Sequence, residues 1–339
     1  DRFTRGEAIR ARPVGVVERT TKWARRRPAQ AAMLSLGLFV LTTGLGAAVW
    51  YQGILAARRA EIALREGEAR RSAAASLDQS TSAIAAEAWD EADRALAHAR
   101  ARSLEANSRE LDATIVSLVD AVQLARTLDA TRQSRVPPLG AGMNLPGVVK
   151  SYATNFRDAG IPVDQDSHTC AHMVRASPIR EQLPVALDCW ASLSYDLDDK
   201  QGAERLLAIS REVDRGSAWR DRFRTPSGWS DREAVLQLAM EAQTATGTLG
   251  PADHHIGLLG LRLGQVEARD EGIELLRRGL LRRPDDFWMN WELGFACWLA
   301  RRYQEAVAPL RAAIAIRPSN AFAFDLRAKA LVRSGEIEE

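Results

Sequence analysis

The sequence predicts an all-α protein with a single transmembrane helix, a long helical hairpin and then an α-helical solenoid. Three observations support this prediction. Residues 29–57 contain no Asp, Glu, Lys, Arg or His. Ala, Leu, Arg and Glu dominate the remainder, while alternating patterns typical of strands are scarce. A period of 34 residues appears after residue 252.

The charge-free run predicts a helix that spans a bilayer at residues 29–52. A hydrocarbon core of roughly 30 Å needs about 20 apolar residues in helical form. Trp23 on one side and Trp50 and Tyr51 on the other are amphipathic rings, which favour the headgroup layer. Two alternatives stay open here. One is a cleaved secretory signal, whose apolar core would be shorter, and the other is a buried core helix.

Residues 1–28 predict a basic cytoplasmic juxtamembrane segment, with nine Lys or Arg against three Asp or Glu. Such an excess places the N-terminus in the cytoplasm and residues 53–339 outside it, in a single-pass protein of the cell membrane. The net charge of the chain is only +2, so residues 29–339 are slightly acidic. We therefore expect the lipid bilayer as a partner of residues 29–52, and no nucleic acid.

Residues 53–135 predict a long helical hairpin, because Gly and Pro are almost absent and charges of both signs alternate. We expect two long helices that fold back near Trp89. A linker rich in Pro and Gly follows at residues 136–147. Residues 148–250 predict a helical domain of degenerate repeats. Its expected breaks lie at Gly160-Ile161-Pro162, Ser177-Pro178 and residues 225–228.

Residues 251–339 repeat themselves every 34 positions. Small residues recur where two helices must approach closely, and Pro recurs where the second helix ends. The recurring pairs are Leu259-Gly260 with Leu293-Gly294, Gly272 with Ala306, Leu276 with Leu310, Gly279 with Ala313, and Pro284 with Pro318. Asp253, Asp286 and Asn320 stand where each unit needs an N-cap.

Together with Asn290 and Tyr303, these positions resemble the tetratricopeptide repeat. The resemblance implies complete units at residues 253–286 and 287–320 and a partial unit at 321–339. In tetratricopeptide proteins the first helix of each unit lines a concave groove that takes a protein or peptide.

The matching groove positions of this chain carry an aromatic stripe. Trp288, Trp291, Phe295 and Trp298 are spaced to share one helical face. A groove of this kind, rimmed by basic side chains, would suit an extended peptide or a partner helix. The alternative is that the rings pack against the preceding unit. The expected groove residues are His254, Leu261, Trp288, Trp291, Phe295, Trp298, Phe322, Lys329 and Arg333.

Several segments resemble bacterial eukaryotic-like transmembrane Ser/Thr protein kinases. Residues 2–3, 6–7, 9–15, 18–19, 23 and 26–28 are similar to the stretch between the kinase domain and the transmembrane helix. Residues 175–180, 186–190, 219–222 and 286–294 are similar to the extracytoplasmic helical region. The resemblance implies that the chain is the C-terminal part of such a protein, after its kinase domain, and acts in signal transduction.

The motifs of phosphoryl transfer are missing from the sequence. It has no Gly-rich loop after a strand, no Val-Ala-Ile-Lys, no His-Arg-Asp catalytic loop and no Asp-Phe-Gly. We therefore expect no catalytic and no cofactor-binding residue in this chain. ATP and Mg²⁺ would belong to a kinase domain N-terminal to Asp1.

Two segments of the sequence contain closely spaced histidines. His168, Cys170 and His172 would need further ligands, and an ordinary helix or loop is preferred. His254 and His255 are expected to form a solvated cap, so no metal ligand is predicted.

The three cysteines, Cys170, Cys189 and Cys297, are too few for a disulfide framework. We expect each cysteine to be a small, buried apolar residue. A disulfide bond between Cys170 and Cys189 is the less favoured alternative.

The function expected from the sequence is a membrane-anchored sensor module that binds a protein or peptide. One alternative is a stand-alone membrane-tethered scaffold with no signalling role, and a remote one is an exported metalloenzyme. The sequence is compatible with a monomer and with a homodimer.

Overall fold

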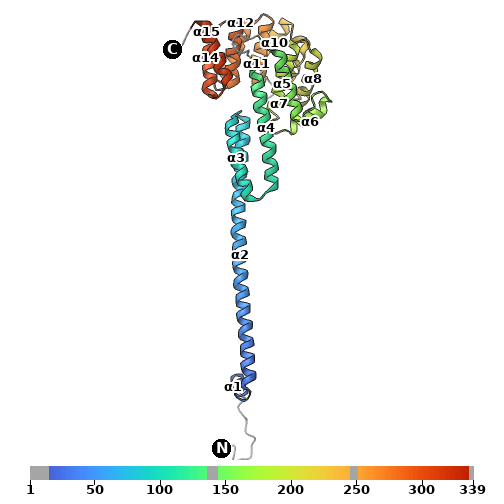
Figure 1. Cartoon of the computed structure of the whole chain (residues 1–339). Helices are drawn as coiled ribbons and strands as arrows, with labels where there is room; N and C mark the ends of the chain where they lie inside the picture. Colours follow the sequence, from blue (N-terminus) through green and yellow to red (C-terminus); the bar gives the residue numbers. More distant parts are fainter. Residues whose placement is uncertain (1–14, 136–143, 245–250, 336–339) are drawn as a thin grey trace, which may run out of the picture. The chain divides into compact units, whose positions relative to one another are not determined.

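The computed structural model describes residues 15–135, 144–244 and 251–335. These residues form α-helices α1 to α15 and one short 3₁₀ helix, and none of them lies in a strand. The predicted all-α class is confirmed (Figure 1). The chain divides into two compact units, which are described separately. One comprises residues 1–71 with 105–107, and the other comprises residues 72–104 and 108–339.

The first unit contains α1 (Val16–Arg26) and the N-terminal part of α2 (Pro28–Ala85). Within the described residues, α2 is the one helix long and apolar enough to cross a membrane, and its most apolar window is 0% buried. A core helix would be mostly buried, so the exposure of this window argues against a core helix packed among the described residues. The Thr42 and Thr43 hydroxyls donate to the carbonyls of Leu38 and Phe39 at 2.9 and 2.7 Å, which satisfies polar groups inside the apolar stretch.

The predicted two-helix hairpin at residues 53–135 contains three helices, because the chain reverses twice. After α2 come α3 (Trp89–Ala106) and α4 (Arg109–Gln133). The chain first reverses its direction at Glu87, between α2 and α3, which is close to the predicted fold-back near Trp89. The second reversal lies at Asn107, which has a φ of 49°. Asn tolerates the left-handed conformation, so this turn needs neither Gly nor Pro and the sequence pattern did not reveal it.

Residues 144–244 form seven short helices. The first helix begins at Leu145, where the Asn144 side chain accepts a hydrogen bond from the Gly147 N–H at 3.0 Å. The predicted linker therefore ends earlier than residue 147, and its residues 136–143 lie outside the described part. The helices are α5 (Leu145–Asp158), α6 (Ser167–Ala176), α7 (Gln182–Asp196), α8 (Lys200–Val213), α9 (Ala218–Phe223), η2 (Pro226–Gly228) and α10 (Arg232–Thr244).

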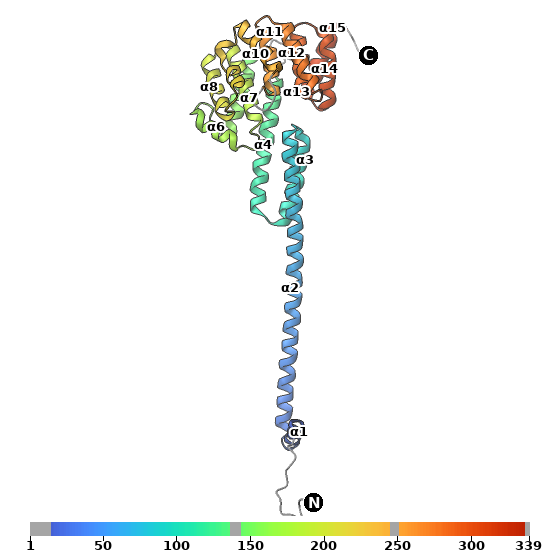
Figure 2. The same cartoon turned by 180° about the vertical axis from the view of Figure 1, so that it is seen from behind.

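The 34-residue period corresponds to two equivalent helix pairs. They are α11 (Asp253–Gln265) with α12 (Arg269–Arg282) and α13 (Phe287–Leu299) with α14 (Tyr303–Ile316), followed by α15 (Ala321–Ser334). These helices stack in chain order (Figure 2). A Cβ on Gly260 would lie 2.7 Å from Leu276, and one on Gly294 would lie 2.5 Å from Leu310. The glycines therefore serve the predicted close approach, and the arrangement is a tetratricopeptide-like helical solenoid.

Two of the three predicted N-caps are confirmed. The side chains of Asp286 and Asn320 each accept a backbone N–H, from Met289 and Ala323, at 2.8 Å. Asp253 does not cap its helix, because it is already the first helical residue and Ala252 occupies the N-cap position. Its carboxylate instead pairs with Arg283 at 2.6 Å.

The structure adds an equivalent pair, α7 with α8, that the sequence period did not reveal. Ala191, Ala203 and Leu207 precede Gly260, Gly272 and Leu276 by the same number of positions, and all three are fully buried. The turns also match. Asp198, Glu267 and Arg301 have φ values of 65°, 63° and 59°. In each turn the next N–H bonds the carbonyl five residues back, at 2.9, 2.8 and 2.8 Å, which is a Schellman-type helix end.

Candidate interaction site

The aromatic stripe of α13 is buried and does not line an open groove. Trp288, Trp291 and Phe295 are 8%, 0% and 3% exposed, and Trp298 is half-buried. The rings form a continuous ladder, with Phe295 5.2 Å from Trp291 and 6.2 Å from Trp298. The expectation that these four residues together present one open groove is therefore corrected, because another element of the chain covers Trp288, Trp291 and part of Phe295.

That element is the last turn of α4 together with the two residues that follow the helix. The Arg132 guanidinium lies 3.7 Å from the centre of the Trp288 ring, and that of Arg135 lies 5.5 Å from Trp291 and 5.6 Å from Phe295. Guanidinium groups stack favourably on aromatic faces. A segment far away in sequence is thus one packing partner of the rings, and α13 also contacts α11 and α12 of the preceding repeat.

One carboxylate neutralises the two arginines. Glu292 Oε1 accepts from Arg132 at 3.2 Å and from Arg135 at 2.7 Å, and none of the three side chains is more than 7% exposed. Glu292 Oε2 and Arg132 Nε have no protein partner. The inner face of the repeats therefore holds a buried and incompletely satisfied charge cluster, which we call the α4 plug.

A second layer of polar contacts joins the hairpin to the later repeats. Arg317, after α14, pairs with Glu87 at 2.5 Å and with Asp129 of α4 at 3.1 Å. The Trp288 indole N–H donates to Glu87 at 2.9 Å. Burial raises the pKa of Asp129, although Arg317 opposes that rise. The hairpin and the repeats are consequently held together through both hydrophobic and charged contacts.

The remaining predicted groove residues do not gather around the stripe. His254 and Lys329 are largely buried, Lys329 beside Asp325 and His254 beside Asp188. Phe322 is half-buried and Arg333 is exposed. The predicted basic rim of Lys329 and Arg333 is thus not present as one surface.

The repeat positions named from the sequence occupy helix contacts and turns. Most of them are buried between paired helices, whereas Gly279 and Tyr303 are half-buried and Pro284 and Pro318 lie exposed in turns. The buried ones are Leu259, Gly260, Gly272, Leu293, Gly294, Ala306 and Ala313.

An open part of the inner face remains beside the α4 plug. Residues of α7, α11 and α13 line a cavity of about 340 Å³ there, with Leu261, Phe295 and Leu299 as apolar walls and Arg269 at its edge. Leu261 and Phe295 are therefore the predicted groove residues that line this cavity. Arg135 also lines this cavity, so the cavity and the plug share a side chain.

His254 and His255 are not a solvated cap. The His255 ring is fully buried, and its Nδ1 accepts the Ala252 N–H at 3.1 Å. Both rings approach Asp188 Oδ2, at 3.1 Å from His254 Nε2 and 3.3 Å from His255 Nε2. Asp188 also pairs with Arg224, and both side chains are 0% exposed. The histidines thus belong to a buried ionic cluster.

The ligand atoms of Asp188, His254 and His255 lie within 4.8 Å of one another, which is a possible metal geometry. Arg224 argues against it, because its Nε and Nη2 bind the two carboxylate oxygens at 3.1 and 2.9 Å. A divalent cation would sit beside a buried guanidinium. Burial would raise the pKa of Asp188, yet Arg224 and the histidines hold it well below its usual value. Asp188 is therefore already paired with a buried guanidinium.

The other candidate metal segment, residues 168–172, does not bring its three side chains together either. His168 and His172 are exposed, whereas Cys170 of the same helix points into the core. The three cysteines are free and buried, as expected. Burial raises the pKa of Cys170 to about 11, so its thiol is unsuited to metal binding.

Comparison with known proteins gives few relatives. No family model matches the chain, and no curated protein matches it. Among solved structures, the chain is similar to the tetratricopeptide domain of P58(IPK), with 11% identity over 78% of this chain and 79% of that one, at a TM-score of 0.25.

Proposed function

We propose that this chain is a membrane-anchored, tetratricopeptide-type module that binds a protein or peptide outside the cytoplasm. In this proposal it is the non-catalytic C-terminal part of a transmembrane Ser/Thr protein kinase. The observation that carries the proposal is the α4 plug, because it joins the interaction face of the repeats to the helical hairpin that continues into α2.

The cavity beside the plug is the proposed partner site. Its apolar walls, Leu261, Phe295 and Leu299, and the nearby Arg269 suit a partner segment with apolar and acidic side chains. A partner that contacts Phe295 touches the ring on which Arg135 stacks. The partner would change the contact between α4 and the repeats only if the partner bound more tightly to one arrangement of the plug than to another.

Partner capture is tested with the full chain in lipid nanodiscs, incubated with membrane-envelope extract. We expect Leu299→Glu to remove captured proteins, because it places a charge in an apolar wall. The control is Leu281→Glu, since Leu281 is 83% exposed on α12. Equal capture by both variants and the unmodified chain would refute the cavity as the partner site.

Membrane topology is tested by introducing single cysteines. The natural cysteines are buried, whereas Thr20 and Thr114 are exposed on opposite sides of the proposed span. In intact cells, a membrane-impermeant maleimide should label Thr114→Cys and spare Thr20→Cys. Labelling of Thr20→Cys alone would reverse the proposed orientation.

The kinase part of the proposal is supported by the resemblance of residues 2–28 to the exit from a kinase domain. Its test is the reading frame upstream of Asp1. A frame that encodes no His-Arg-Asp loop and no Asp-Phe-Gly would overturn it, and would favour a tethered scaffold instead.

A further inference from the structure

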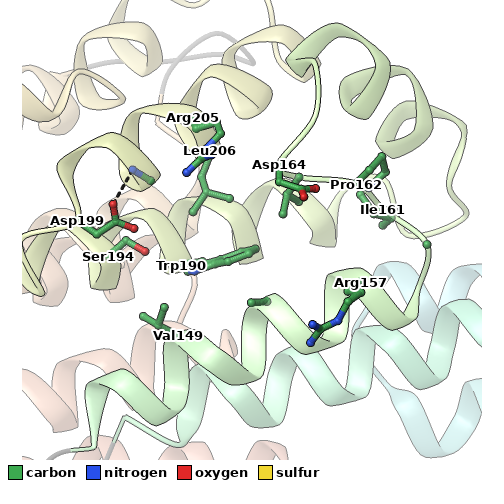
Figure 3. A pocket seen from close by; sticks show the side chains of 14 residues that line it. Val149, Arg157, Ile161, Pro162, Asp164, Trp190, Ser194, Asp199, Arg205 and Leu206 are labelled. Carbon is green, nitrogen blue, oxygen red and sulfur yellow. Dashed lines mark hydrogen bonds between the residues drawn. The ribbon is translucent and has the colours of Figure 1, made fainter.

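A second cleft lies away from the inner face of the repeats, between α5, α7 and α8. Its volume is about 470 Å³, and the loop at residues 160–164 closes one end (Figure 3). This volume is in the range of sites for small organic ligands. None of its lining residues belongs to the α4 plug or to the proposed partner site.

The floor of the cleft is a rigid apolar platform. Trp190 of α7 is 7% exposed, and Tyr152 stacks on it at 6.2 Å with an interplanar angle of 10°. Phe156 lies 5.6 Å from the same ring. Val149 and Leu206 continue the apolar lining. Because the Trp190 ring is held by its neighbours, it can accept a ligand without repacking.

Two arginines face each other across this platform. Figure 3 shows Arg157 on the wall formed by α5 and Arg205 on the wall formed by α8, with Trp190 between them. Arg157 donates to Thr154 Oγ1 at 3.0 Å. Within the described residues, neither guanidinium has a carboxylate partner. Guanidinium groups bind carboxylates with two parallel hydrogen bonds.

Two acidic residues also line the cleft. Asp199 is already engaged, because its carboxylate accepts the Gly202 N–H at 2.8 Å and caps α8. Asp164 is exposed on the loop. Of the charges that are not engaged, two are positive and one is negative. This balance favours a ligand with one negative charge and disfavours a dianion.

We infer that this cleft binds an organic monocarboxylate with an aromatic or branched apolar body. The carboxylate lies between Arg157 and Arg205, and the body covers Trp190. Such a carboxylate belongs to a free organic acid or to the C-terminus of a peptide. The inference does not depend on the proposed partner site or on the membrane orientation.

The test uses 4-benzoylbenzoate, a photoreactive aromatic carboxylate, with the full chain in nanodiscs. Irradiation followed by peptide mapping should place saturable labelling within residues 145–164 and 182–206. The neutral amide of the same compound should label these segments at least tenfold less at equal concentration. An unlabelled dicarboxylate should compete less well than 3-phenylpropionate.

The variant Arg157→Gln with Arg205→Gln should lose the saturable labelling. Both side chains are exposed, so a thermal melt should show unchanged folding. The matched control is Arg94→Gln with Arg311→Gln, two exposed arginines outside the cleft. A third variant, Trp190→Phe, keeps an aromatic platform and should retain weaker labelling.

The source of the carboxylate is distinguished by competition. Competition by 3-phenylpropionate alone indicates a free acid. Competition by a short peptide ending in Phe, and not by its C-terminal amide, indicates a peptide terminus. Labelling that does not saturate, that is equal for the neutral amide, or that survives in the double arginine variant would overturn the inference.

Discussion

Glu292→Gln is the sharpest test of the α4 plug. Glu292 is the carboxylate that contacts both Arg132 and Arg135, at 3.2 and 2.7 Å, and it is only 1% exposed. Glutamine keeps the size of the side chain and one acceptor oxygen, but it removes the negative charge. Two buried guanidinium groups would then face the aromatic rings without this counter-ion.

The expected cost is large for a single atom change. Removing one partner of a buried ion pair costs about 3–5 kcal/mol of the free energy of unfolding. Glu87 and Arg132 line the same pocket, and the Glu87 carboxylate offsets part of this loss. We therefore expect a value near the lower end, about 3 kcal/mol. For a unit of this size, that lowers Tm by roughly 6 °C or more.

The assay is guanidinium-induced unfolding in nanodiscs, followed by tryptophan fluorescence and circular dichroism. Glu305→Gln is the control, because Glu305 is exposed and pairs with Arg302 and Arg277 on the surface. Glu305→Gln should lower the free energy of unfolding by less than about 1 kcal/mol. Equal midpoints for the two variants would refute the reasoning, since the plug would then contribute no more than a surface pair.

The replacement of all three charged residues provides a second check. Glu292 Oε2 and Arg132 Nε are unsatisfied, so the cluster is not an optimal network. Replacing Arg132 and Arg135 by Met and Glu292 by Leu should therefore restore most of the stability that Glu292→Gln loses. If the triple variant were as unstable as the single one, shape and not charge would dominate the contact.

Three further predictions concern packing, pH and metal. Gly272→Ala should lower the free energy of unfolding by about 1–3 kcal/mol, because its Cβ would lie 2.4 Å from the Gly260 carbonyl oxygen. The control Gly264→Ala, with open space around it, should be neutral or stabilising in urea titrations. Stability should fall as pH drops below about 6.5. Burial lowers the pKa of His255 to about 3, so the unfolded chain takes up a proton that the folded chain does not. This should remove about 2 kcal/mol by pH 5, and a melt series showing no such loss would contradict the burial of the ring. Zn²⁺ should leave Tm unchanged, because Arg224 occupies both oxygens of Asp188. A rise of several degrees that EDTA reverses would show that the guanidinium yields this carboxylate to a metal.

Local patterns in the sequence predicted the repeats well. The spacing of Gly260, Gly294 and Pro318 placed the helix pairs, and Asp286 and Asn320 were found as caps, because each of these features acts within a few residues of the chain. The pair α7 with α8 was missed, since Ala and Ser replace its glycines and no Pro marks its end. The turn at Asn107 was missed for a similar reason.

The sequence by itself determined the all-α class, the apolar helix at residues 29–52 and the 34-residue repeat. All three can be predicted from composition and periodicity, because each depends on the local order of residues along the chain. Only the tertiary structure decided what covers the aromatic stripe. Arg132 and Glu292 are 160 positions apart, and no local preference pairs them. Their contact arises because the aromatic face must be removed from water and the helix that covers it brings two charges, which only a buried carboxylate can balance.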